Sequence, residues 1–367
     1  MANKYNTKKK YCILGNYLKT SLEGERKETR RYSNTVNTWQ EVDERKKVLE
    51  KNEDFLKSCY FGDKKRAFLA LRNTNGENGA EINCKDKNGN NGLILAVYSR
   101  KEEVIKMLVN YNKDEKGRIF EDIEPIKLNE LNNDRISALH LAVKLKNLKI
   151  AKVLLQAGAN PNVVGKYGET PIFDSVREDD REMIELLLSY GAKLNVKNRE
   201  GHTPLIVASQ NRNRQEALLC LIKNGADIYE TDKNLRTPLM HAANNDNGAM
   251  MDIILKATKY DKDYMNNVDI NGVSTLIICA KRGNREAVRV LLSRGVNPFG
   301  LDKKGKSAAD YASYNNHHTC FEIIEKAKRI HIFAESMETT QDNKQKYLLQ
   351  ELEKIGKQNR VQNSCMK

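Results

Sequence analysis

The stretch Gly165–Lys197 reads GKYGETPIFDSVREDDREMIELLLSYGAKLNVK and predicts two short helices joined by a polar loop. Thr170 and Pro171 are typical of a helix start, because a Thr hydroxyl can accept a hydrogen bond from an orphan backbone N–H and Pro has no N–H to lose. The polar run 177–180 ends the first helix. The second helix begins near Arg181, ends at Gly191 and places four apolar residues on one face: Met183, Ile184, Leu187 and Leu188.

Helices of about ten residues cannot close a hydrophobic core alone, so this unit needs a neighbour on each side. The same pattern recurs along the chain. Its apolar position after the helix start falls at Leu93, Leu139, Ile172, Leu205, Leu239, Leu276 and Ala309. The spacings between these positions are 46, 33, 33, 34, 37 and 33 residues. The chain is therefore built mainly from a repeated unit of about 33 residues.

The repeated unit resembles the ankyrin repeat in both period and residues. The helix starts match that family at 137–142 (SALHLA), 203–205 (TPL) and 237–239 (TPL), and the ends of the second helices match at 154–160 (LLQAGAN), 221–227 (LIKNGAD) and 291–297 (LLSRGVN). The resemblance covers residues 52–327, in seven to eight units. It implies an all-α solenoid of stacked helix-turn-helix units with short turn or hairpin tips.

We expect three regions along the chain. Residues 1–37 are polar and basic, with few large apolar residues (Tyr11, Ile13, Leu14, Tyr17 and Leu18), and are expected to be disordered. Residues 38–327 form the solenoid. It opens with a leading helix and a degenerate unit in which Asp63 caps the second helix, and it carries an insertion at 111–123 that we expect to be a mobile excursion. Residues 328–367 form a basic tail with a short helix at 341–357. Three alternatives stay open for this helix: folding back on the last repeat, pairing as a short coil, or remaining alone.

Composition and motifs argue against an enzyme. The seven Cys contain no CxxC pair, which favours reduced thiols in a reducing compartment. The resemblance implies a structural role for the His at position 140, and no spacing of nucleophile and base stands out. We therefore expect no catalytic residue, no cofactor and no metal site. No window of about eighteen apolar residues exists, so we expect no membrane insertion and a cytoplasmic protein, with the nucleus or a cilium or cytoskeletal location as alternatives.

The resemblance also implies where a partner docks, since the tips and the exposed side of each first helix line one concave groove in such solenoids. The first four units present a mixed surface there, with a summed charge of about +1, while the last three sum to about +7. The candidate partner-binding residues are Tyr98, Ile136, Leu145, Tyr167, Arg199, Lys233, Arg236, Lys281, Arg282, Lys303, Lys304, Lys306 and Tyr314.

The net charge of +14 favours an acidic partner. Our leading hypothesis is a protein-interaction scaffold that binds an acidic segment across residues 233–306. A component associated with microtubules, the cytoskeleton or a cilium is the first alternative, because a microtubule wall is acidic. Nucleic-acid binding is the second and less favoured alternative, since the sequence contains no recognised nucleic-acid module.

Overall fold

The computed structural model of the chain describes residues 39–72, 79–114, 117–337 and 340–357. The segment 1–37, expected to be disordered, lies outside these residues. The chain divides into two compact units, Met1–Lys166 and Tyr167–Lys367, and each is described by itself. No strand occurs in the described ranges, so the expected all-α class is confirmed.

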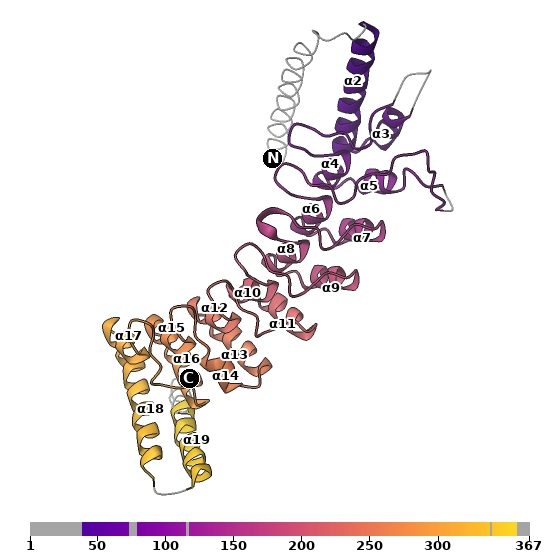
Figure 1. The fold of residues 1–367 in the computed structure, drawn as a ribbon. Coiled ribbons are helices and arrows are strands. Elements are labelled where there is room, and N and C mark those ends of the chain that lie inside the picture. The colour runs from indigo at the N-terminus through magenta and orange to yellow at the C-terminus, as the bar shows by residue number, and fades with distance from the viewer. Residues whose placement is uncertain (1–38, 73–78, 115–116, 338–339, 358–367) are drawn as a thin grey trace, which may run out of the picture. The chain divides into compact units, whose positions relative to one another are not determined.

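In its described residues, the first unit has three helix pairs in two layers (Figure 1). These are α2 (Trp39–Phe61) with α3 (Lys64–Leu71), α4 (Gly92–Tyr98) with α5 (Glu102–Val109), and α6 (Ala138–Lys144) with α7 (Leu148–Gln156). In one layer α2 packs on α4 and α4 on α6, and in the other α3 packs on α5 and α5 on α7. The cap predicted at Asp63 is confirmed, because its side chain accepts a hydrogen bond from Arg66 N at 2.9 Å at the start of α3.

The insertion at 111–123 forms a short hairpin in its described part. Lys113 and Ile119 form an antiparallel bridge, and Phe120 N donates to Asn112 O at 2.8 Å. Ile119 and Phe120 are both exposed. The mobility expected of this segment stays a prediction.

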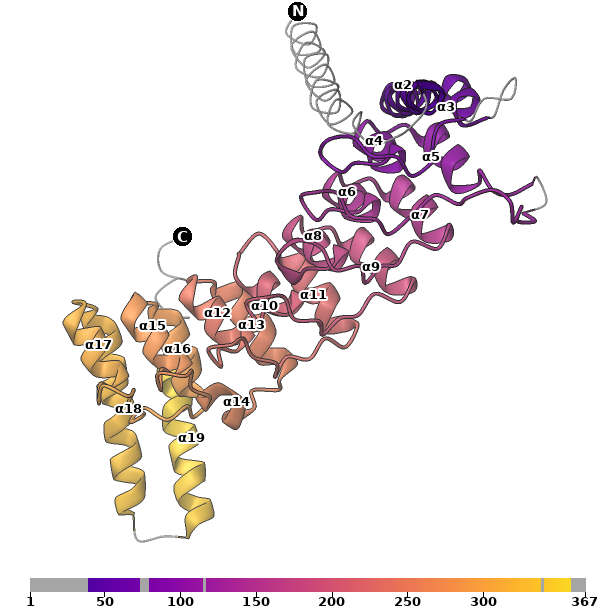
Figure 2. The same ribbon diagram turned by 45° about the horizontal axis from the view of Figure 1, so that its top comes forward.

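The second unit continues the same two-layer arrangement within itself (Figures 1 and 2). Its first helices are α8 (Pro171–Arg177), α10 (Pro204–Ser209), α12 (Pro238–Asn244), α15 (Thr275–Arg282) and α17 (Ala308–Tyr314). Its second helices are α9 (Arg181–Ser189), α11 (Gln215–Lys223), α13 (Gly248–Ala257), α16 (Arg285–Ser293) and α18 (His318–Ser336). The short turn η1 (Lys166–Gly168) lies where the two units join in sequence, and the extra helix α14 (Lys262–Asn266) lies in the longer fifth repeat.

Hydroxyl caps start most of the first helices, as the sequence predicts. The side chains of Ser137, Thr203, Thr237 and Ser274 each accept a hydrogen bond from the backbone N–H three residues later. Thr170 is the exception, because its buried hydroxyl makes no cap bond and has no partner. The capping role expected for Thr170 was therefore wrong. Pro171, which has no N–H to lose, still begins α8.

The C-terminal helices close the second unit. Helix α18 runs to Ser336, past residue 327 where the last repeat was expected to end. Helix α19 (Gln341–Lys357) turns back and packs against both α18 and α16, with Leu352 and Ile355 buried. Of the three alternatives for this helix, the structure shows that it folds back. Helix α19 contacts the last two repeats, since α18 belongs to the last repeat and α16 to the repeat before it.

No helix in the described ranges combines the length and the apolar content that a bilayer crossing requires.

Candidate functional site

Most of the tips that connect successive repeats begin with an Asp or Asn whose side chain hydrogen-bonds the backbone of the tip. Asp232 Oδ1 accepts the backbone N–H groups of Asn234 at 2.8 Å and Arg236 at 2.9 Å. The equivalent bonds recur in the tips that start at Asp86, Asn198, Asp269 and Asp302. The backbone of each of these tips is therefore held by its own first side chain, and the residues between these bonds project outward.

Backbone hydrogen bonds also join neighbouring tips. In the first unit Asn133 N donates to Asn88 O at 2.9 Å. In the second unit, bonds of 2.8 to 2.9 Å run from Arg199 N to Tyr167 O, from Ile270 N to Asn234 O and from Lys303 N to Asn271 O. These bonds hold the tips that they join in register.

The first unit brings two of the predicted site residues together. Tyr98 is 56% exposed, and its ring stacks on that of Tyr60 with centroids 6.3 Å apart. Tyr98 and the half-buried Ile136 line one pocket of about 390 Å³. Leu145 does not line this pocket, and its carbonyl accepts a bond of 3.5 Å from Arg100.

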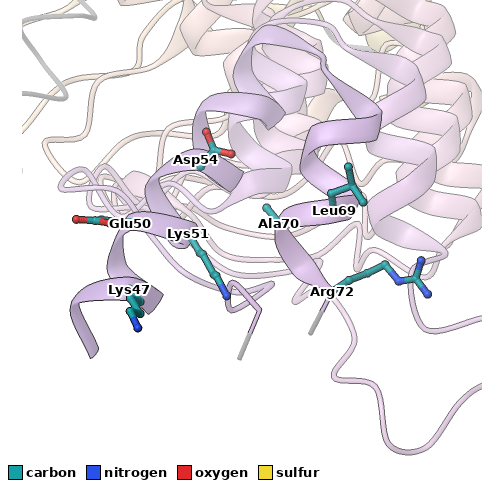
Figure 3. Close-up of a pocket in the computed structure, with 7 residues that line it drawn as sticks. All are labelled: Lys47, Glu50, Lys51, Asp54, Leu69, Ala70 and Arg72. Atoms are coloured by element: carbon teal, nitrogen blue, oxygen red, sulfur yellow. The ribbon is translucent and has the colours of Figure 1, made fainter. Parts of the chain in front are cut away.

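A second pocket of the first unit, of about 380 Å³, lies between α2 and α3 (Figure 3). Charged side chains of both signs line it, among them Lys47, Glu50 and Asp54. Asp54 is ion-paired with Arg66. Because the charges on its walls are mixed and partly paired, this pocket shows no preference for one sign of ligand.

At the start of the second unit, the cation of Arg177 is neutralised. Arg177 forms an ion pair with the buried Glu169, and Asn198 Nδ2 also donates to Glu169 at 3.0 Å. Tyr167 and Arg199, two of the predicted site residues, are both exposed at this end.

The last three repeats differ, because several of their cations are exposed and form no ion pair with a described residue. We call six of the predicted residues the basic face: Lys233, Lys281, Arg282, Lys303, Lys304 and Lys306. None of the six forms an ion pair with any residue in the described ranges. Like-charged side chains in one row repel each other, so an anionic ligand would relieve a repulsion that already exists.

Arg236 was also predicted to bind a partner, and the structure places it differently. Its Nε and Nη2 atoms each lie 2.9 Å from Asp232 Oδ2, inside its own tip. Its charge is therefore largely used within the fold.

Two tyrosines restrain part of the basic face. Lys306 Nζ lies 5.8 Å from the ring centroid of Tyr311 and 5.3 Å from that of Tyr314, and Lys281 Nζ lies 5.7 Å from Tyr311. Tyr311 is itself held by the bond of 2.7 Å that its hydroxyl donates to Asp302. Tyr314 is 78% exposed. Cation–π contacts keep these two ammonium groups in place, which lowers the entropy lost when they bind an anion.

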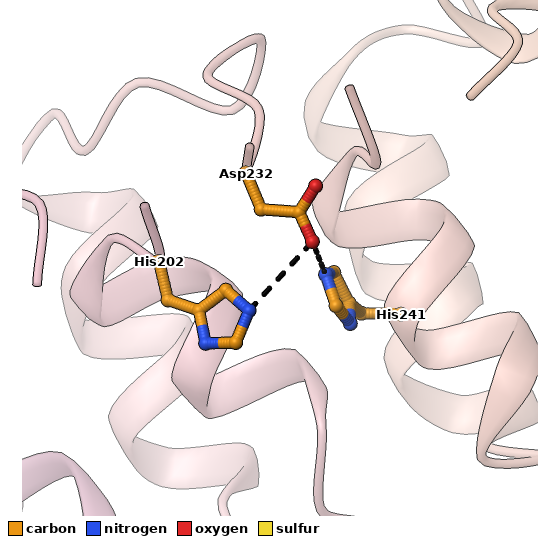
Figure 4. Close-up of side chains that lie close together, drawn as sticks. All are labelled: His202, Asp232 and His241. Carbon is orange, nitrogen blue, oxygen red and sulfur yellow. Dashed lines mark hydrogen bonds and ion pairs between the residues drawn. The ribbon is translucent and has the colours of Figure 1, made fainter. Parts of the chain in front are cut away.

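A buried cluster of His202, Asp232 and His241 is the one group with metal-ligand chemistry in the described ranges (Figure 4). Asp232 Oδ2 lies 3.0 Å from His241 Nε2 and 3.6 Å from His202 Nε2. Burial and the Arg236 cation lower the pKa of His241 to about 4, so its ring is neutral at pH 7 and Nε2–H donates to the carboxylate.

The donors around Asp232 decide what this cluster does. Burial alone would raise the pKa of Asp232, but the backbone N–H groups of Arg236 and Asn234 and the nearby guanidinium lower it. Oδ2 thus already accepts bonds from both Arg236 and His241. A metal ion would have to displace Arg236, so we assign the cluster to the stability of the fold.

Sequence reasoning did not bring these three residues together. A signal was present, because His241 follows the tip residue Asp232 by nine positions and His202 stands just before the helix start of the previous repeat.

The buried cysteines, among them Cys220 and Cys279, are core residues. Burial raises the pKa of both thiols, and it raises that of Cys84 to about 12. These thiols are therefore protonated at neutral pH and poor nucleophiles.

Comparison with known proteins agrees with the repeat geometry. A family model described as ankyrin repeats (3 copies) matches five overlapping segments that together run from residue 57 to residue 334. The chain is 33% identical over 106 residues to a putative ankyrin repeat protein of fowlpox virus (strain NVSL), a match that covers 28% of this chain and 70% of the viral one.

Two further similarities concern the B-cell lymphoma 3 protein. The mouse homologue is 33% identical over 175 residues, which cover 45% of this chain and 37% of that protein. The solved ankyrin repeat domain of Bcl-3, described as a unique member of the IkappaB family, superposes with a TM-score of 0.55 at 27% identity and covers 65% of this chain and all of that one. The chain thus spans well under half of the mouse relative.

Proposed function

The chain belongs to the ankyrin repeat family, and from that premise we propose that it is a scaffold that binds an acidic segment of a partner protein across the basic face. Ankyrin repeats are protein-interaction modules rather than enzymes, and stacked repeats present an extended surface for binding. The acidic character of the partner and its place on this chain are the new parts of the proposal.

The observation that carries the proposal is the contrast between paired and unpaired cations within the second unit. Arg177 and Arg236 are neutralised by Glu169 and Asp232, whereas the basic face has no such partners in the described part of the chain. An exposed ion pair contributes about 0.2–1 kcal/mol, so four to six of them supply a few kcal/mol together. Binding of this kind weakens as salt screens the charges.

A direct test uses a fluorescent poly-glutamate peptide and the full chain, with binding followed by anisotropy. We expect the set Lys281→Glu, Arg282→Glu, Lys303→Glu and Lys304→Glu to weaken binding at least about tenfold. The matched control reverses four exposed cations outside the face, Lys223, Lys259, Lys262 and Lys346, which changes the net charge equally. Equal loss in both sets would mean that only net charge matters, which sinks the proposal.

Affinity purification of the full chain from a lysate, with mass spectrometry, then names the partner. Partners that are retained by the control set and lost by the basic-face set support the proposal, and an unchanged set of partners refutes it. Sedimentation with microtubules and a gel shift with unrelated oligonucleotides, both titrated with salt, identify the acidic surface if it is a microtubule or a nucleic acid.

A further inference from the structure

A second binding feature lies in the first unit, far along the sequence from the basic face. The pocket of about 390 Å³ is walled by the end of α2, by α4 and by the two tips at 86–90 and 132–136. Three aromatic rings form one side of it. Tyr60 meets Phe61 edge-to-face at 5.3 Å and stacks on Tyr98 at 6.3 Å. Leu56, Ile94, Leu95, Ile136 and Leu141 form the apolar remainder.

Two of the three rings of this aromatic wall are well exposed. Phe61 is 50% exposed and Tyr98 is 56% exposed. Large aromatic side chains grouped at a concave site of this size are typical of a place that takes an apolar side chain.

The rim of the pocket adds a charge preference. It carries the carboxylates of Asp86 and Asp134 and one cation, Lys57, which is ion-paired with Glu53. Asp86 is used by its own tip, where it accepts bonds from Asn88 and Asn90, while Asp134 is exposed and forms no ion pair with a described residue. The pocket therefore suits an apolar side chain that has a cation beside it.

One segment of the chain itself has this chemistry. Residues 8–19 read KKKYCILGNYLK, which combines four Lys and no acidic residue with five large apolar side chains: Tyr11, Ile13, Leu14, Tyr17 and Leu18. It lies outside the described residues.

The chain length allows this segment to reach the pocket. From Trp39 to Phe61, α2 spans about 33 Å at 1.5 Å per residue. The twenty residues from Lys19 to Thr38 can extend to about 66 Å. A tether of this length holds the segment near the pocket at an effective concentration on the order of millimolar.

We propose that residues Tyr11–Leu18 dock in this pocket of their own chain, with apolar side chains on the Tyr60–Tyr98 wall and a flanking lysine beside Asp134. The docked segment occupies the pocket until a competing ligand with the same apolar and cationic chemistry displaces it. This self-ligand does not depend on the basic face, because its residues lie entirely within the first unit.

Photo-crosslinking in the full chain tests the proposal. Benzoylphenylalanine in place of Leu14, irradiated at low protein concentration and mapped by peptide mass spectrometry, is expected to form crosslinks within one chain to residues of the pocket. Tyr98→Arg, which removes an exposed ring and adds a repelling cation, should lower the yield about fivefold or more. Phe120→Arg is the matched control, since Phe120 is 48% exposed in the same unit and does not line the pocket.

A second variant keeps the test independent of any effect of Tyr98 on folding. Asp134→Lys changes only an exposed tip residue and should also lower the yield. Crosslinks to other regions, crosslinks between two chains, an absence of crosslinks, or yields unchanged by both pocket variants would each overturn the proposal. Crosslinks between chains would identify a second copy as the occupant.

Discussion

Replacing Asp232 by Ala should destabilise the second unit far more than the same change at Asp269, although both residues start a repeat tip. The two carboxylates share one task, since each accepts the backbone N–H groups two and four residues later, at 2.8 to 2.9 Å. The loss of two such bonds costs about 2 kcal/mol, and this part is common to both variants.

Asp232 carries two further bonds that Asp269 lacks. Its Oδ2 accepts Arg236 Nε at 2.9 Å and His241 Nε2 at 3.0 Å. Without the carboxylate, Arg236 can turn to water because its side chain is 35% exposed, but the buried ring of His241 keeps an unsatisfied N–H, at a cost of about 1–3 kcal/mol. With about 1 kcal/mol for the weakened arginine contact, the free energy of unfolding should fall about 2–4 kcal/mol further for Asp232→Ala.

Urea unfolding followed by circular dichroism at pH 7 measures both variants against the unchanged chain. A double-mutant cycle with His241→Ala then isolates the coupling between the carboxylate and the ring, which we expect to be about 1–2 kcal/mol. If the two Asp→Ala variants lose the same free energy within about 0.5 kcal/mol, the buried cluster contributes nothing beyond an ordinary tip, and the reasoning given for it fails.

Three further predictions concern stability. Burial lowers the pKa of His241 to about 4 and also lowers the pKa of His331, so the unfolded chain binds more protons than the folded chain below pH 6.5. The free energy of unfolding should therefore fall as the pH is lowered from 6.5 to 4, by up to about 3 kcal/mol for His241. Urea titrations at several pH values measure this change. Leu235 has a φ of 59° on an exposed tip, so Leu235→Gly should raise the free energy of unfolding by about 0.5–1 kcal/mol. The adjacent control Asn234→Gly should lower the free energy of unfolding, and thermal unfolding compares the two variants. Leu352 is fully buried where α19 packs on the repeats, so Leu352→Ala should cost about 2–4 kcal/mol, and a loss below about 1 kcal/mol would show that α19 is not docked in solution.

Most helix boundaries were predictable because their signals are local and recur. A hydroxyl residue before a Pro or a small apolar residue is typical of a helix start, and the period of about 33 residues places such a start in most repeats. The unpartnered hydroxyl of Thr170 shows the limit of this signal, since residue type does not determine side-chain orientation. The place of α19 was not predictable either, because its apolar stripe is compatible with folding back, pairing as a short coil or remaining alone, and only tertiary packing selects one of these.

The candidate surface was predictable in outline and not in detail. Repeat register alone predicts that Tyr98 and Ile136 stand on neighbouring repeats, and both line one pocket. Register does not report which cations are already paired, so Arg236 was counted with the exposed lysines although Asp232 holds it. The cluster around Asp232 was missed for the same reason: the residues are 9 to 39 positions apart, and their contact depends on rotamers.

Two equivalent tips show how one repeat position can either build the fold or leave a charge for binding. Arg236 and Lys306 each stand four residues after the Asp that starts their tip. At the first tip the guanidinium of Arg236 forms an ion pair with Asp232, so its charge is neutralised within the tip. At the second, the hydroxyl of Tyr311 occupies Asp302 Oδ2 at 2.7 Å, in the position that His241 takes at Asp232.

The consequence for Lys306 is that its ammonium group forms no ion pair with Asp302 and lies instead over the rings of Tyr311 and Tyr314. The tyrosines hold this cation in place without neutralising it. At the other tip the equivalent positions hold Arg236 and His241, and there the cation is ion-paired with Asp232. The unpaired charge of Lys306 therefore follows from the side chains chosen at its own tip rather than from a general abundance of lysine, and this is a physical reason to look for an anionic ligand there.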